Sequence, residues 1–391
     1  MSLRKDRQRI FTRGLGKMSV REIEPSESTI YVDIGYLGGT VLTQEFVTED
    51  LVTEDGYVFN SLAHSENCQL TTNLQQTSIH EINLIRNADA RVYSVRYDGA
   101  LNPERNYYQY YCMEQAKIIA NLQRNFETGL KPLSLTVKAI KKDYTLYHIP
   151  LFYLIEARRE LSIDKCNLWI DAKQDLNLNT IYCLDHSGFA RHGIFTQPSF
   201  WGFDTGLSLR YIAFTTAGTD YMNLGNVLND STGIDFGIEC WLYITGANNS
   251  QQIFLHKKQV ITDNTAGFAL YRNATNKIVF RLSSGSGSAE IVSSNSVMQN
   301  TWTHVFVAIN RNGNGQIYIN GSADGSPVSV ASIGSGSNSQ NYIVGTSISG
   351  LNSAFRFTTL RHYIYGTGGL PLNIATIVSN HYNAERGYHG I

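Results

Sequence analysis

The sequence lacks the features of membrane, secreted and nucleic-acid-binding proteins. Its 391 residues contain no apolar run near the roughly 18 residues that a membrane-spanning helix needs. Residues 1–18 also lack the apolar centre of a secretory signal. Charged residues make up only 17%, with 32 Lys and Arg against 33 Asp and Glu, so binding to nucleic acid through a global positive charge is a poor fit. We expect a chain made and folded in a cytoplasm, without a membrane partner.

Cysteine is scarce and unpatterned. The five cysteines are widely spaced, with no C-x-x-C pair and no Cys/His spacing of the zinc type. We expect reduced, mostly buried thiols and no disulfide framework. The residues are Cys68, Cys112, Cys166, Cys183 and Cys240.

The signatures of catalysis are also missing. Phosphate-binding loops, G-x-S-x-G and H-E-x-x-H are absent. Asp235 and Glu239 are the only acidic pair on a strong strand. Four residues along a strand span about 13 Å, whereas glycoside hydrolysis needs two carboxyl groups about 5–9.5 Å apart. We therefore predict that the protein is not an enzyme and has no catalytic residues.

No metal or cofactor site is predicted. Asp263-Asn264 and Asp230 lie in predicted loops, but without the clustered spacing of a calcium site, and turn formation explains them equally well. The ten histidines are scattered singly, so each is expected to be a surface group or a satisfied core group.

Glycine, tyrosine and β-branched residues dominate instead. The chain has 33 Gly, 23 Tyr and only 7 Pro, which favours many strands joined by glycine turns. From residue 167 onward, nine apolar runs alternate with Gly, Ser or Asn turns, as expected for an antiparallel sandwich. The runs are IYCLD, LRYIAF, FGIECWLYI, GFALYR, KIVFRLS, THVFVAIN, GQIYING, NYIVG and FRFTTLRHYIY.

Composition changes near residues 160–170. Residues 1–160 hold 19 basic and 20 acidic residues, whereas the remaining 231 residues hold 13 of each. Within the first part, the net charge is +6 over residues 1–21 and −11 over residues 22–85. We predict a basic N-terminal arm at 1–27, a β domain at 28–160 and a β-sandwich at 161–391, all mainly β.

The domain at 28–160 is predicted to hold several strands and one helix. Residues 29–34 and 91–97 are rich in β-branched and aromatic residues, and residues 133–140 alternate as LSLTVKAI. Residues 107–126 are aromatic-rich; a helix is possible there, but we favour a strand. Ser78-Ile79-His80-Glu81 has the capping-box spacing, which predicts a short helix over 79–87.

The last 220 or so residues resemble the concanavalin A-like lectin superfamily, specifically the laminin G-like modules. The resemblance implies a two-sheet jelly roll. It implies that Trp241 and Trp302 are core aromatics, with a sugar-stacking platform as the alternative. The residues that carry the resemblance are 235–243, 267–270, 301–308, 315–321, 360–365 and a helix-like tail at 374–382.

Residues 28–160 resemble the tail-tube-type domains of tailed-phage virions in the order of their elements. These are an entry strand, a long loop at 38–58, a strand at 66–73, a helix near Ile79, a strand at 91–97 and a late pair at 107–126 and 129–140. Such domains form rings that stack into a tube, and some carry an external sandwich domain.

That resemblance implies a virion structural protein of a tailed phage, a tail tube subunit made in the host cytoplasm. Its partners would be further copies in a stacked ring, other tail proteins, and DNA passing through a lumen without specific binding. The alternative is a glycan-binding surface adhesion protein, with a carbohydrate-active enzyme third. The predicted assembly residues are Arg4, Lys5, Arg7 and Arg9 with Glu45, Glu49, Asp50, Glu54 and Asp55.

Overall fold

A computed structural model of the chain divides it into two compact units, residues 1–159 and 160–391. No helix among the residues described has the length and apolar character that a membrane crossing requires. The described residues are 3–11, 16–24, 32–52, 58–74, 92–98, 107–121, 133–139, 153–158, 165–173, 181–187, 189–197, 200–215, 220–229, 233–348, 351 and 353–391.

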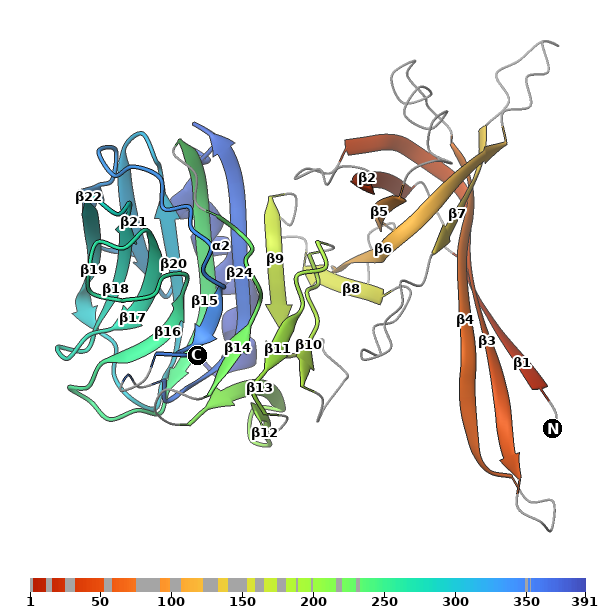
Figure 1. Cartoon of the computed structure of the whole chain (residues 1–391), viewed down its shortest axis with the longest axis horizontal. Helices are drawn as coiled ribbons and strands as arrows, with labels where there is room; N and C mark the ends of the chain where they lie inside the picture. Colours follow the sequence, from red (N-terminus) through yellow and green to blue (C-terminus); the bar gives the residue numbers. More distant parts are fainter. Residues whose placement is uncertain are drawn as a thin grey trace. The chain divides into compact units, whose positions relative to one another are not determined.

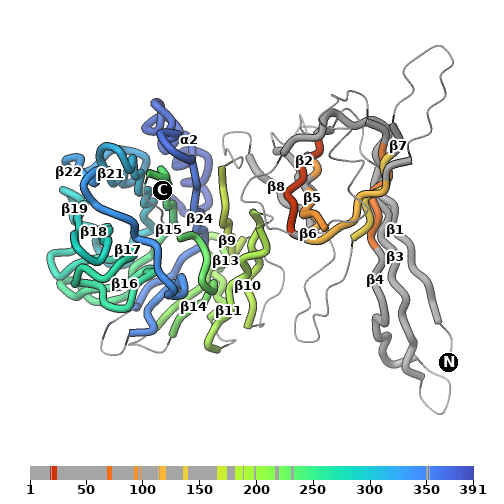
Figure 2. Tube along the Cα trace, turned by 45° about the horizontal axis from the view of Figure 1, so that its top comes forward, coloured from red at the N-terminus to blue at the C-terminus, as the bar shows by residue number. Residues whose placement is uncertain are grey.

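The first unit is one antiparallel sheet that closes on itself. The strand order is β1-β3-β2-β5-β6-β7-β4, and β4 pairs back with β3, so that the strands from β2 to β7 form a ring (Figures 1 and 2). β8 pairs with β6 outside this ring. The strands are β1 (Leu3–Phe11), β2 (Gly16–Glu24), β3 (Val32–Val52), β4 (Val58–Leu74), β5 (Val92–Asp98), β6 (Tyr107–Asn121), β7 (Leu133–Ala139) and β8 (Tyr153–Arg158).

Alternating side chains fill the centre of this ring. Because successive side chains of a strand face opposite sides, apolar residues on one face of β2, β5, β6 and β7 are buried together. The expected strands at 91–97, 107–126 and 133–140 are confirmed as β5, β6 and β7, each with slightly different ends. The buried cluster comprises Met18, Val20, Cys68, Leu70, Tyr93, Val95, Tyr97, Met113, Ala116, Ile118, Leu135, Val137 and Ala139.

The loop predicted at 38–58 is wrong. Most of this segment belongs to the hairpin of β3 and β4, whose register runs from Leu37 opposite Leu74 to Val52 opposite Val58. Its Val, Thr and Leu residues favour strands, and pairing with β4 outweighs the acidic residues between them. β1 and β2 are strands of the same sheet and include most of residues 1–27. The helix predicted at 79–87 lies outside the described residues.

The second unit is a sandwich of two antiparallel sheets (Figure 1), as the sequence predicts. Each of the nine apolar runs contains a strand. The first sheet has the order β10 (Tyr182–Cys183), β11 (Gly193–Phe195), β14 (Tyr221–Asn223), β23 (Ile343–Gly345), β16 (Gln252–His256), β17 (Gly267–Arg272), β18 (Lys277–Ser283) and β19 (Ser288–Ser296). The second has the order β12 (Trp201–Asp204), β13 (Leu209–Phe214), β24 (Phe355–Thr367), β15 (Ile234–Ile244), β20 (Trp302–Ile309), β21 (Asn314–Ile319) and β22 (Ser322–Ser329), with β9 (Cys166–Asp171) beside β24.

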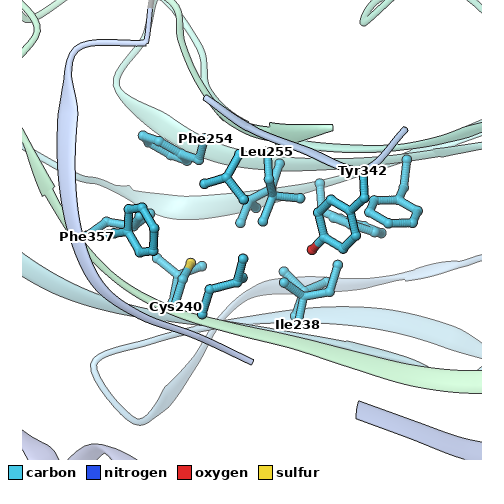
Figure 3. Close-up of a cluster of buried hydrophobic side chains, with 14 of the residues drawn as sticks. Ile238, Cys240, Phe254, Leu255, Tyr342 and Phe357 are labelled. Atoms are coloured by element: carbon cyan, nitrogen blue, oxygen red, sulfur yellow. The ribbon is translucent and has the colours of Figure 1, made fainter. Parts of the chain in front are cut away.

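The main core lies between the two sheets. Figure 3 shows side chains from both, among them Ile238 and Cys240 of β15 facing Phe254 and Leu255 of β16. The Tyr342 hydroxyl is buried in this cluster and has no hydrogen-bond partner. The expectation of buried, reduced thiols is confirmed for the cysteines whose side chains are described: Cys68, Cys166, Cys183 and Cys240.

A helical segment at the end of the chain covers the outer face of the second sheet. α2 (Ile374–Glu385) confirms the predicted helix-like tail and is followed by the short helix η3 (Arg386–His389). Their Tyr382 and Tyr388 pack against Trp241 and Trp302 in a small apolar cluster. Strands β15 and β20 are therefore buried on both faces.

Candidate functional site

A hollow of about 360 Å³ opens on the first sheet of the sandwich. Its volume falls in the range of about 300–1,000 Å³ that is typical of small-molecule sites. It is formed by strands β14, β23 and β16 and by the segments that follow β16 and flank β23. The lining residues are Tyr221, Asn223, His256, Lys258, Gln259, Gln340, Asn341, Ile343, Ser347 and Ile348.

Strand register places this hollow on the side of the sheet away from the core. Asn223 lies opposite Ile343, and Ile343 lies opposite His256. The neighbouring residues Met222 and Leu255 belong to the core between the sheets. Because side chains alternate along a strand, Asn223, Ile343 and His256 face outward together.

His256 lies in the lining with one ring nitrogen unpaired. Its Nδ1 is 2.9 Å from the carbonyl oxygen of Lys258, and since a carbonyl only accepts, Nδ1 carries the proton and donates. Burial lowers the pKa of His256 from 6.5 to about 4, so the ring is neutral at pH 7 and Nε2 holds a lone pair. Nε2 has no hydrogen-bond partner in the protein. An unpaired buried acceptor costs about 1–3 kcal/mol.

Lys258, the one charged residue of the lining, directs its ammonium elsewhere. Nζ donates to the carbonyl oxygen of Asp263 at 2.9 Å and to Ser283 Oγ at 3.1 Å, and lies 3.6 Å from Asp263 Oδ1. Burial lowers the pKa of Lys258 to about 8. The rest of the lining offers amides, hydroxyls, an imidazole and apolar side chains, which can bind a polar ligand without a charge.

A second polar cluster lies on the other sheet, beneath α2, and centres on Glu239. His304 Nε2 donates to Oε1 at 2.9 Å, while Tyr363 OH at 2.6 Å and His381 Nδ1 at 3.0 Å donate to Oε2. Arg361 lies 3.2 Å from Oε1. Burial raises the pKa of Glu239, but attraction to His381 and Arg361 and the histidine hydrogen bonds hold it well below its ordinary value of 4.5.

Glu385, the last residue of α2, completes this cluster. Its Oε1 accepts from Arg361 at 2.7 Å and from Lys173 at 3.2 Å, and its Oε2 accepts from Trp241 Nε1 at 2.9 Å. Burial raises the pKa of Glu385, yet Arg361 and Lys173 hold it well below its ordinary value. The carboxylate thus ties the helix to strands β15 and β24.

The aromatic contacts complete the attachment of the chain end. His389 stacks on Trp241 with ring centroids 3.8 Å apart and planes 4° apart. Its Nδ1 donates to the Glu385 carbonyl oxygen at 3.1 Å, and its Nε2 lies 2.8 Å from Thr358 Oγ1. Trp241 is 0% and Trp302 4% exposed, which confirms them as core aromatics, with no open face for a sugar. We interpret the cluster as a structural attachment for α2.

The two carboxylates of the acidic pair, Asp235 and Glu239, are both hydrogen-bonded within the protein. Asp235 Oδ1 accepts from the backbone N–H of Arg311 at 2.8 Å and Oδ2 from that of Leu370 at 3.0 Å, so it fixes two loops. Glu239 is 0% exposed. Asp263 is bound within its own loop by Thr265 and Lys258, and no group of metal-ligating side chains occurs among the described residues. Asp230 lies outside them.

The predicted assembly residues lie on two paired strands of the first unit. Arg4, Lys5, Arg7 and Arg9 are on β1, and Glu45, Glu49 and Asp50 are on β3. Backbone register sets Arg7 directly opposite Glu45, and Leu3 opposite Glu49. The basic and acidic segments therefore meet within one chain. Glu54 and Asp55 lie outside the described residues.

Sequence reasoning singled out Glu239 but did not bring together the residues of the Glu239 cluster or those of the hollow. His256 precedes the Lys257-Lys258 pair, and nothing in its local pattern marks it. Glu239, His304 and His381 come from β15, β20 and α2, far apart in the chain, so only strand pairing brings them together. The available signal was a polar residue in the middle of an apolar strand, at Glu239 and at His304.

Comparison with known proteins supports a lectin-like second unit. A family model described as the Concanavalin A-like lectin/glucanases superfamily matches residues 216–365. The C-terminal unit therefore carries a concanavalin A-like, laminin G-like lectin domain. No curated protein matches the chain.

Three solved structures illustrate the similarity. The binding domain of Paraclostridial Mosquitocidal Protein 1 is 15% identical, with a TM-score of 0.46 over 57% of this chain and 52% of that one. The Botulinum Neurotoxin serotype G binding domain is 18% identical, with a TM-score of 0.42 over 56% and 50%. The Botulinum neurotoxin serotype D binding domain is 14% identical, with a TM-score of 0.44 over 57% and 51%. The chain spans about half the length of these structures.

Proposed function

We propose that the protein is a non-enzymatic glycan-binding protein and that the hollow on β14, β23 and β16 holds the sugar. The observation that carries this proposal is the outward-facing hollow of about 360 Å³ on a lectin-like sandwich. Its size suits a small ligand, and its amide and hydroxyl groups match the hydrogen-bonding hydroxyls of a sugar.

The lining offers the two kinds of contact that a sugar needs. Tyr221 and Ile348 are half-buried, so they supply apolar surface for the C–H face of a pyranose ring. Asn341 and Ser347 are exposed polar residues of the same hollow, and they can exchange hydrogen bonds with ring hydroxyls. A sugar bound here would lie over β23, between the segments at 340–341 and 347–348.

The test is a glycan array probed with the full-length protein, followed by titration calorimetry with the glycans that bind. Asn341→Ala removes one amide from the hollow and is expected to weaken binding about fivefold, as loss of one neutral hydrogen bond does. Asn312→Ala is the matched control, because Asn312 is exposed but does not line the hollow. Absence of binding to any glycan, or equal weakening by both variants, would contradict the proposal.

A second candidate function is assembly into stacked rings as a tail tube subunit of a tailed phage, with the lectin-like unit outside the ring. It is favoured by β1, which within the described residues pairs with β3 alone. An edge strand has unpaired N–H and C=O groups along its outer side, which can pair with a strand of a neighbouring subunit.

Negative-stain microscopy tests this second candidate, since rings or tubes are its direct product. Replacing Arg4, Lys5, Arg7 and Arg9 by Gln should weaken stacking, and so shorten the tubes, more than it changes the melting of the isolated subunit. Lys117 and Lys138 are exposed lysines of β6 and β7, so their replacement by Gln is the control. A purified protein that forms neither rings nor tubes would exclude this function.

A further inference from the structure

We propose that the hollow selects an uncharged sugar, and that His256 Nε2 accepts a hydrogen bond from one of the sugar's hydroxyl groups. This inference rests on the proposed function, because it names the class of glycan that the hollow would take. It follows from three features of the lining: a ring nitrogen without a partner, a fixed tautomer, and the absence of a free cation among the described lining residues.

The first feature is the unpaired nitrogen. His256 is 3% exposed and lines the hollow, and its Nε2 has no hydrogen-bond partner in the protein. Buried polar atoms are nearly always paired. Nε2 itself is covered, so the lining side chains over it have to shift slightly before a ligand hydroxyl in the hollow can reach this nitrogen and supply the missing partner.

The second feature is the tautomer. The Lys258 carbonyl oxygen at 2.9 Å keeps the proton of His256 on Nδ1, and Nε2 therefore presents a lone pair. A lone pair needs a donor, which a hydroxyl or an amide N–H supplies. A carboxylate or sulfate has only acceptor oxygens, so it would face this nitrogen without forming a bond.

The third feature is that the ammonium groups of Lys257 and Lys258 are already hydrogen-bonded within the protein. Lys258 Nζ is held by Asp263 and Ser283, on the side of β17 and β18. The preceding residue is Lys257. Its Nζ donates to Asn226 Oδ1 at 2.7 Å and to the Gln340 carbonyl oxygen at 2.5 Å. Both ammonium groups are engaged, so neither is free to pair with the carboxylate of an acidic sugar.

The experiment uses the full-length protein and saturation-transfer NMR with six probes. The uncharged probes are galactose, mannose, fucose and N-acetylglucosamine, and the acidic probes are N-acetylneuraminic acid and glucuronic acid. At least one uncharged sugar is expected to bind, and neither acidic sugar. His256→Leu should then weaken binding of that sugar about fivefold to tenfold, while His256→Gln, whose Oε1 is an acceptor, should retain most of it.

His362→Phe is the matched control. His362 is another buried histidine with an unpaired ring nitrogen, Nδ1, but it lies in the core, stacked on Phe236. Its replacement should leave sugar binding at the wild-type level, so a general effect of losing a buried histidine is separated from an effect at the hollow. Melting temperatures of all variants show whether each is folded.

The outcomes separate this inference from the proposed function. Binding of acidic sugars alone, or binding of an uncharged sugar that His256→Leu leaves unchanged in a folded variant, would overturn the inference and leave glycan binding in place. Absence of binding to every probe and to a glycan array would remove the proposed function and the inference with it.

Discussion

Neutral histidines in the core should make the lectin-like unit sensitive to mild acid, and His362 gives the sharpest test. It lies on β24, with its ring 5.5 Å from the Phe236 ring and 5.9 Å from the Phe268 ring. Burial, helped by repulsion from Arg191 and Lys257, lowers the pKa of His362 from 6.5 to about 3. The folded protein therefore keeps this ring uncharged well below neutral pH.

The direction in which pH changes the stability follows from proton binding at His362 in the folded and unfolded states. Below pH 6.5 the unfolded chain binds a proton at His362, whereas the folded chain binds it only near pH 3. Stability contributed by the neutral ring is therefore complete above pH 6.5 and is lost as pH falls. At pH 5 the loss is about 2 kcal/mol, which is 1.5 pH units multiplied by about 1.36 kcal/mol per unit.

His362→Phe removes this proton site while keeping an aromatic ring of similar size, so its cost at pH 7.5 should stay below about 1.5 kcal/mol. The four tryptophans, Trp169, Trp201, Trp241 and Trp302, all lie in the second unit. Tryptophan fluorescence during urea titration thus reports the unfolding of that unit within the full chain. Between pH 7.5 and 5, the wild type should lose about 2 kcal/mol more than the variant. Equal losses would refute the reasoning.

Three further substitutions test the packing of the same unit by the same urea titration. Glu385→Gln should lower the free energy of unfolding by about 3–5 kcal/mol, because it leaves the buried Arg361 without its principal partner; a loss below 1 kcal/mol would contradict the attachment role. Tyr342→Phe removes a buried hydroxyl that has no hydrogen-bond partner, so the free energy of unfolding should stay equal or rise by about 1 kcal/mol. A clear loss of stability would contradict the absence of a partner for this hydroxyl. Gly267→Ala should destabilise by more than about 1 kcal/mol, since Gly267 has φ of +127° and a Cβ there would meet the Lys257 carbonyl oxygen at 1.9 Å; an unchanged midpoint would contradict this.

The strands of the sandwich could be predicted because their signal is local. Apolar runs such as 267–272 and 277–283 are bounded by turn residues, and in the structure they pair as β17 and β18. Ser284 to Gly287, in a Gly/Ser stretch, form the turn that joins β18 to β19. Local propensity and tertiary pairing agree in these segments, so no knowledge of partners is needed.

The hairpin of β3 and β4 could not be predicted in the same way. Residues 38–58 contain two Val-Thr-Glu-Asp copies, and the loop was predicted there from the order of elements in tail-tube-type domains. Strand formation there depends on pairing, with Thr43 opposite both Arg9 of β1 and Gln69 of β4. The partner on one side lies in residues 3–11, far away in the sequence, so the loop prediction failed where a long-range pairing decides the structure.

Trp241 shows why the Glu239 cluster and the hollow could not be predicted either. It is buried as expected, but Ile238, Cys240 and Leu242 face the core between the sheets, and Trp241 lies in the small cluster on the other side, with Glu239. Alternation along a strand shows which residues share a face. It does not show which face packs against the main core when both faces are covered. Here α2 covers the outer face, and Glu385 bonds to Trp241 across that contact. The outward face of β16 has no helix among the described contacts, and there the same alternation leaves His256 at the hollow. The difference between an internal attachment and a binding site thus depends on which sheet the chain end covers.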